Sequence, residues 1–462
     1  MRAVISMIND FSDYMNGTLT FLNSNCYFSF DGKTLEIYCV NGEARIILWE
    51  KLADGSCVSA KKEIPSNRLE GHSFDLNADV VFYIDSKGYG YHGSIDTEKV
   101  ILKINVLKYI TIKSKICDKN ILVFSSKQFH KFLYLFPQYN LTLRHEDKIA
   151  DITYKSAVSS DKAEFTFKGK KFVAYPCPTI NTQGNKFDFI PEIHIVCDES
   201  LEETEMLSLV EILYKIISFL FMRVNIIPDS IYCCSNNLQH NIFYRKATDY
   251  IEEKEDVNSI IKYGFIRWNT VYKNFQKIID DFIDGNADTK HLGNSSESRK
   301  WIDFKKVSTI SSFFESTYAL IYGNKPNHRT STQKNIDTII ETLLPLKDKG
   351  NRKMGDTIDY LIKQLDHVSL ETKIQKVLNE YDGYLRAIKK EFGLENNSVT
   401  EIAGICAQTR NWTDHGDKRA AINPFIASCF AYLTCATYAM YLKRWGIDDK
   451  FIANALLELY MV

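Results

Sequence analysis

The spacing of apolar residues changes once along the chain, near Asp198, and this change constrains the fold more than any other feature. Before it, short segments alternate apolar and polar residues, as Leu102, Lys103 and Ile104 do within residues 100–106. A period of two is typical of strands with one buried face. After it, the long apolar segments repeat with the period of a helix. The sequence therefore predicts an α+β fold, with the strands first and the helices after them.

The first part has the features of an antiparallel β domain. Further alternating segments cover residues 35–40, 44–49, 109–113, 163–168 and 193–197. Turn-forming pairs such as Asp31-Gly32 and Lys168-Gly169 lie between them. We predict a β-sandwich or barrel-like domain over residues 1–198, with a short helical piece near residues 127–135.

The rest of the chain is predicted to be helical. Ser200 and Glu203 have the spacing of a capping box, which predicts a helix running to about Asn225 and closed by Pro228. Helical periodicity follows over residues 258–284, 300–322, 335–344, 357–364 and 370–392, then in two helices around residue 410 and a last one from residue 448. We divide this part into a helical connecting region, residues 199–297, and a helical bundle, residues 298–462.

Charge and cysteine content limit the function classes. The net charge of −1 comes from 57 basic and 58 acidic residues, so any binding of nucleic acid must come from a local patch. The 11 cysteines show no zinc-binding spacing; the only close pair is adjacent, Cys233 and Cys234. The neighbouring carboxylates Asp280 and Asp281 are interpreted as a solvated helix face. We expect no metal or cofactor, and a cytoplasmic protein with free thiols.

Residues 424–442 carry no charge, which raises the question of a membrane span. The stretch also contains three tyrosines, several hydroxyl residues and four alanines, a mixture too polar for lipid. We therefore predict the central helix of a bundle or of a dimer, and no membrane association.

The most informative stretch reads Arg410-Asn411-Trp412-Thr413-Asp414-His415-Gly416. A capping box predicts a helix from Ser398, with Ile402, Ile405 and Cys406 on its buried side. The helix should end near the motif, because Asn423-Pro424 is a start signal for the next one.

A helix end between Arg410 and His415 allows these two side chains to converge. Arginine presents a planar, permanently charged fork that matches a phosphate, and histidine exchanges protons near neutral pH. Together they can hold a phosphodiester and activate the adjacent 2′-hydroxyl of RNA, a reaction that needs no metal. The alternative is structural: Arg410 pairs with a carboxylate and His415 caps a helix.

The order Arg-Asn-x3-His-Gly at a junction of two helices resembles the signature of the HEPN nucleases, which is Arg-x4-6-His with a polar residue after the arginine. A β-rich first part with the segment Gly-Thr-Leu-Thr-Phe at residues 17–21, followed by helices, resembles the abortive-infection subgroup called ApeA. Trp412 and Asp414 depart from the family pattern, in which many relatives carry aliphatic residues.

This resemblance implies a β domain that acts as sensor and a HEPN bundle that acts as endoribonuclease. The expected substrate is cellular RNA, with tRNA anticodon loops as the target, in anti-phage defence triggered by a phage-encoded partner. Arg410 and His415 would be catalytic. Asn411 would hold a phosphate oxygen or fix the histidine ring.

Three further residues are expected to assist. Lys418 and Arg419 follow the motif and are placed to bind flanking phosphates. Glu315 lies among apolar residues of a predicted helix, where a carboxylate needs a partner, and it is expected to orient Arg410. A surface position is the alternative for Glu315.

Acid-base cleavage uses two proton-transfer groups, whereas the motif supplies one histidine per chain. We therefore expect a homodimer through the HEPN domain, which can pair again into a tetramer. The alanines of residues 424–445 would allow close packing at that interface. A competing hypothesis is a non-catalytic helical module for dimerisation or ligand binding, with the β domain as recognition surface. A third, a carbohydrate-active β-sandwich enzyme, lacks an evident carboxylate pair.

Overall fold

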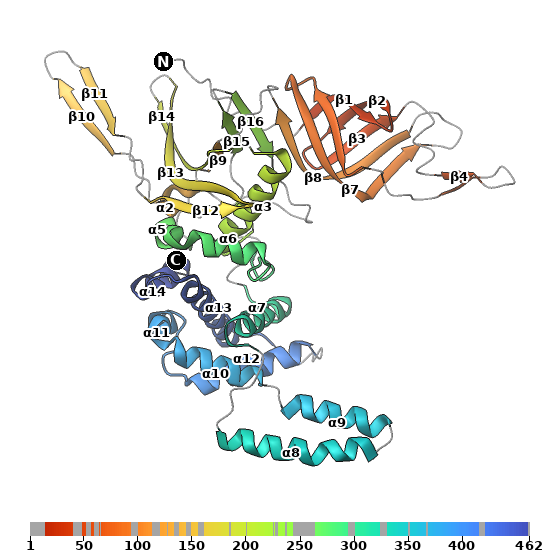
Figure 1. Ribbon diagram of the computed structural model, residues 1–462. Helices are drawn as coiled ribbons and strands as arrows, with labels where there is room; N and C mark the ends of the chain where they lie inside the picture. The colour runs from red at the N-terminus through yellow and green to blue at the C-terminus, as the bar shows by residue number, and fades with distance from the viewer. Residues whose placement is uncertain are drawn as a thin grey trace. The chain divides into compact units, whose positions relative to one another are not determined.

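The computed structural model describes residues 14–39, 49–51, 57–59, 64, 66–93, 100–112, 121–126, 128–133, 138–144, 149–155, 161–183, 186–199, 201–224, 226, 230–235, 238–243, 264–293, 301–323, 330–349, 352–365, 368–414 and 421–460. The chain divides into two compact units. Unit 1 comprises residues 1–214 and 226–261, and unit 2 comprises residues 215–225 and 262–462. The α+β class predicted from the sequence is confirmed: an antiparallel β region precedes a helical region (Figure 1).

Six antiparallel strands of unit 1 close into a barrel-like ring, drawn in red and orange in Figure 1. They are β1 (Met15–Phe21), β2 (Ser24–Phe30), β3 (Thr34–Cys39), β6 (Arg68–Ser73), β7 (Ala78–Gly93) and β8 (Val100–Ile112). Each strand pairs with the next in the order β1-β2-β3-β8-β7-β6, and β6 pairs with β1. Closure leaves these strands without a free edge over the paired residues.

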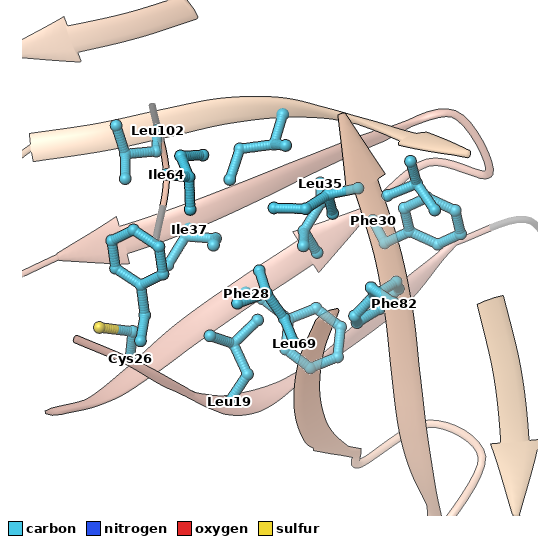
Figure 2. Close-up of a cluster of buried hydrophobic side chains, with 14 of the residues drawn as sticks. Leu19, Cys26, Phe28, Phe30, Leu35, Ile37, Ile64, Leu69, Phe82 and Leu102 are labelled. Atoms are coloured by element: carbon cyan, nitrogen blue, oxygen red, sulfur yellow. The ribbon is translucent and has the colours of Figure 1, made fainter. Parts of the chain in front are cut away.

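The interior of the ring is filled by the apolar residues of the alternating pattern. Along β1 every second residue is buried, because successive side chains point to opposite faces of a strand. Phe82 contacts Phe28 and Phe30 edge to face, with ring centroids 5.2 Å apart in both pairs. Figure 2 shows these rings with Leu35 and Ile37 in one apolar cluster. Of the ring strands, the alternating segments predicted from the sequence cover β3 and β8.

The long strand β8 joins the ring to six further strands. Residues 100–105 of β8 pair with β3, and residues 109–112 pair with β16. From there the sheet continues in the order β16-β15-β9-β14-β13-β12. The bounds are β9 (Ile121–Ser125), β12 (Ala163–Phe167), β13 (Lys170–Gln183), β14 (Lys186–Cys197), β15 (Ser230–Ser235) and β16 (Leu238–Phe243). The two strands predicted over residues 100–106 and 109–113 thus form one strand.

Two small hairpins and a short helix complete the described part of this region. The hairpins are β4 (Trp49–Lys51) with β5 (Cys57–Ser59), and β10 (Gln138–Arg144) with β11 (Ile149–Lys155). The helix is α2 (Phe129–Phe132), which confirms the helical piece predicted near residues 127–135. Residues 44–48 of the strand predicted over 44–49 lie outside the described residues.

The predicted helical connecting region, residues 199–297, is wrong in part. Helix α3 (Glu203–Leu220) is present and ends before the expected Asn225. However, β15 and β16 follow it and add to the sheet by pairing with β9 and β8. These are six-residue strands with a weak apolar pattern, and distant partners set their conformation. Ser200, the expected cap, and Pro228 lie outside the described residues.

Unit 2 consists of helices in its described part. They are α5 (Trp268–Val271), the 3-10 helix η1 (Tyr272–Asn274), α6 (Phe275–Ile283), α7 (Phe304–Tyr322), α8 (Thr330–Lys349), α9 (Arg352–Leu365), α10 (Leu370–Glu380), α11 (Asp382–Glu391), α12 (Val399–Asp414), α13 (Pro424–Trp445) and α14 (Asp449–Tyr460). The single helix predicted over residues 370–392 is two, α10 and α11, because Tyr381 leaves the helical conformation before Asp382-Gly383, a pair with low helix propensity.

Helix α13 is the core helix of unit 2. It packs against α7, α10, α11, α12 and α14. By length and composition it could cross a membrane, but 78% of its most apolar window is buried inside the structure. Ala436 and Ala439 are fully buried within the chain itself. They pack inside one bundle, so the argument that these alanines form a subunit interface is wrong for them.

Candidate active site

Helix α12 carries the motif and begins as predicted. The Ser398 hydroxyl accepts a hydrogen bond from the Glu401 backbone N–H at 3.1 Å, which caps the first turn. Ile402 and Cys406 are fully buried, whereas Ile405 is only half-buried. Burial raises the pKa of the Cys406 thiol well above its usual range, so Cys406 serves packing. The described part of α12 extends to Asp414, and Arg410 lies one helical turn before that residue.

The guanidinium of Arg410 lies between two carboxylates. Its Nε is 3.0 Å from Oδ2 of Asp414, one helical turn further along α12. Its Nη2 is 3.8 Å from Oε2 of Glu315 on α7. The Arg410 side chain remains 37% exposed, so the fork is reachable from solvent. The ion pair brings Glu315 to Arg410, which is the contact expected from the sequence; an orienting role in catalysis stays a prediction.

Two residues that the sequence did not single out complete this group. Lys373 on α10 places Nζ 3.4 Å from Oε1 of Glu315, and its side chain is only 12% exposed. Ser308 on α7 donates a hydrogen bond from Oγ to Oδ1 of Asp414 at 3.3 Å. Neither residue stands in a recognisable motif, and only the packing of α7 and α10 against α12 brings them to Arg410.

The four charged groups balance one another. Arg410 and Lys373 contribute two positive charges, and Glu315 and Asp414 contribute two negative charges. An anion therefore meets no net positive charge from these four side chains. A phosphate can bind Arg410 strongly only if one carboxylate moves away or additional cations approach.

The remaining motif residues differ in what the structure says of them. Asn411 is exposed on α12, and its Oδ1 is 3.5 Å from Nη1 of Arg410, a weak contact. Trp412 is 36% exposed. The predicted catalytic His415 and the predicted RNA-binding residues Lys418 and Arg419 lie outside the described residues. The convergence of Arg410 and His415 thus stays a prediction.

A second polar cluster lies on the sheet of unit 1. The buried carboxylate of Glu192 accepts hydrogen bonds from Thr179 at 2.7 Å and from Tyr232 at 2.9 Å. His194 Nε2 lies 2.8 Å from the same carboxylate. Because each carboxylate oxygen has a partner, this cluster is a satisfied structural network.

Among the side chains that the structure describes, no group of three or more histidines, cysteines or carboxylates is arranged to hold a metal ion. Comparison with protein-family models found no match, and comparisons with curated proteins and with solved structures found none either.

Proposed function

We propose that the chain is an endoribonuclease of the HEPN class that cleaves cellular RNA without a metal. One observation carries the proposal: Arg410 lies near the end of the described part of α12 with a solvent-reachable guanidinium, five residues before His415 in the sequence. Arginine on a helix end can bind a phosphodiester while a residue beyond the end approaches the neighbouring 2′-hydroxyl.

In the proposed reaction each group has one role. Arg410 holds the scissile phosphate, and Asn411 binds a phosphate oxygen or fixes the histidine ring. His415 removes the proton from the 2′-hydroxyl, whose oxygen attacks the phosphorus and expels the 5′-oxygen. The bond to the 5′-oxygen breaks as the 2′,3′-cyclic phosphate forms, and the leaving oxygen takes a proton from the second copy of His415 in the dimer proposed below. Glu315 would keep the Arg410 fork in position.

The biological setting is proposed from the resemblance to the ApeA subgroup. The substrate would be tRNA cleaved at the anticodon loop, in the cytoplasm, after a phage-encoded trigger acts through the β domain. Such cleavage stops translation in an infected cell. Lys418 and Arg419 would bind the phosphates beside the cleaved bond.

We also propose a homodimer, because one chain supplies one motif histidine and the reaction uses two proton-transfer groups. Its interface cannot use Ala436 and Ala439, which are buried within one chain. The first turns of α13, around Phe425 and Ala431, are partly exposed and remain available. Light scattering on the intact protein should give the mass of a dimer or tetramer; a fully active monomer would refute this assembly.

A specific observation favours the non-catalytic alternative. Arg410 contacts two carboxylates on different helices, which is also how a structural arginine joins helices α7 and α12. In that case Arg410→Ala would lower stability and leave any activity toward RNA unchanged.

Arginine-to-alanine variants separate the two functions. Arg386 is the matched control, because it is 80% exposed and pairs with Asp382 at 2.9 Å within α11. Incubated with total RNA, the wild type and Arg386→Ala should cleave equally. The cleavage rates of Arg410→Ala and His415→Ala should be lower than that of the wild type by about 100-fold or more. Full cleavage by folded Arg410→Ala would refute the proposed site.

A further inference from the structure

The two carboxylates beside Arg410, those of Glu315 and Asp414, differ in their other contacts. Glu315 lies in the middle of α7 and is anchored on its other oxygen by Lys373, which is largely buried. Asp414 is the last described residue of α12. Its side chain is 33% exposed, and its contact besides Arg410 is with the neutral hydroxyl of Ser308 rather than with a second cation such as Lys373. Asp414 is therefore the carboxylate that is more easily displaced from Arg410.

The contacts of Asp414 imitate those of a bound phosphate. Its Oδ2 faces Nε of Arg410 at 3.0 Å, and its Oδ1 accepts a hydrogen bond from Oγ of Ser308 at 3.3 Å. Two donors thus grip the two oxygens of one anionic group. A phosphodiester offers two non-bridging oxygens in the same way. Arg410 Nε and Ser308 Oγ form a cradle for a two-oxygen anion, and Asp414 occupies it.

The position of Asp414 determines the net charge beside Arg410. With Asp414 in place, the group of Lys373, Glu315, Arg410 and Asp414 is neutral. When Asp414 leaves the cradle, Arg410, Lys373 and Glu315 carry a net positive charge beside two vacated donors. An incoming phosphate then replaces one anion with another and keeps the cluster neutral.

We propose that Asp414 is an intramolecular substitute for the substrate phosphate, and that Ser308 is a phosphate-binding residue of the site. The proposal rests on the proposed function in that the phosphate belongs to an RNA chain. Asp414 lowers the affinity of the resting site for RNA, and its displacement by a substrate phosphate frees Arg410 and Ser308 to bind. Asp414 reduces RNA binding by occupying Arg410, and it takes no part in the making or breaking of bonds.

The test compares the affinity of the full-length protein and its variants for one probe, a short single-stranded RNA with 2′-O-methyl groups. This probe lacks the nucleophile and cannot be cleaved, so fluorescence anisotropy reports binding alone. Asp414→Asn removes the charge and keeps the shape. Breaking an exposed ion pair should tighten binding about two- to fivefold. Asp382→Asn removes an equal charge from the Arg386 pair on α11 and should leave the affinity unchanged.

The double variant Ser308→Ala, Asp414→Asn should bind the probe more weakly than Asp414→Asn alone, because one hydrogen-bond donor of the cradle is missing. Unchanged or weaker binding by Asp414→Asn, with an unfolding midpoint like that of the wild type, would overturn the proposal. An equal gain from Asp382→Asn would also overturn it, since the effect would then be net charge alone.

Failure of the cradle and failure of the proposed function give different results. If wild-type protein cleaves natural RNA but Asp414→Asn binds the probe no better, the cradle is wrong and the nuclease stands. If Asp414→Asn binds better but neither protein cleaves RNA, the cradle stands and the nuclease is wrong.

Discussion

At the scale of single residues, His291 is a buried histidine of the described helical unit whose pKa lies far below its usual value. It is 3% exposed and stacks on Phe313, with ring centroids 3.5 Å apart. Its Nε2 lies 3.3 Å from the Tyr438 hydroxyl, which itself donates to the Phe219 carbonyl, whereas the buried Nδ1 has no partner. Burial lowers the pKa of His291 to about 3, so the ring is neutral in the folded protein.

This buried ring should make stability depend on pH. Below about pH 6.5, His291 is protonated in the unfolded chain but stays neutral in the folded protein. The unfolded state therefore binds more protons, and the free energy of unfolding decreases as the pH falls toward 3. From pH 7 to about pH 5.5, His291 should cost about 1 kcal/mol of unfolding free energy. Urea unfolding at both pH values should show that the free energy of unfolding decreases less between pH 7 and about pH 5.5 in His291→Phe than in the wild type. Equal losses in the wild type and in His291→Phe would contradict the prediction.

Residue-scale prediction from the sequence succeeded where a local pattern was present. Ser398 and Asn423 cap their helices as expected, since capping depends on residues three positions apart. Asp281 was expected on a solvated face, but it is 5% exposed and binds Arg444 and the Trp445 indole N–H at 2.8–2.9 Å. The sequence does not show which helix covers α6, so this buried ion pair was not predictable.

At the scale of elements, the capping residue Asn423 and the following proline predicted where α13 begins. The sequence left open whether α13 lies inside a bundle or between subunits. The structure places residues such as Ala439 in the bundle core, and Ala427 is only half-buried. The short strands β15 and β16 were missed, because a strand depends on partners far away in sequence and its local signal is weak.

Two alanine substitutions on α13 test this packing. Ala439→Leu adds volume to a closely packed core and should lower the unfolding free energy by about 1–3 kcal/mol without changing the oligomeric mass. Ala427→Leu, three turns earlier on the same helix, should change the unfolding free energy by about 0.5 kcal/mol or less. Urea unfolding and light scattering measure both effects. A stable Ala439→Leu protein that dissociates into smaller species would place Ala439 at a subunit interface instead.

At the scale of the whole molecule, the chain passes between its two units more than once. Unit 2 includes residues 215–225, and the chain then returns to unit 1 over residues 226–261. Phe219, near the end of α3, is fully buried among rings of unit 2, including Tyr438 and Trp445. A single boundary at residue 198 therefore does not separate the units. Composition changes only once along the chain, so it could not reveal this alternation.

For this reason the function is best tested on the full-length protein. A fragment starting at residue 199 would keep β15 and β16 but lose their partners β9 and β8. A fragment starting at residue 262 would lose Phe219 from the core of unit 2, and deleting a large buried side chain costs about 3–5 kcal/mol. Inactivity of either fragment would report unfolding rather than the role of the β domain.

The central claim is cleavage of RNA by its own 2′-hydroxyl with the help of Arg410 and His415. The most direct measurement incubates purified full-length protein with total RNA in EDTA and analyses the ends of the products. We predict that cleavage persists in EDTA, that the products carry 2′,3′-cyclic phosphate and 5′-hydroxyl ends, and that DNA stays intact. Loss of cleavage in EDTA that Mg²⁺ or Mn²⁺ restores, or products with 5′-phosphate ends, would contradict the account.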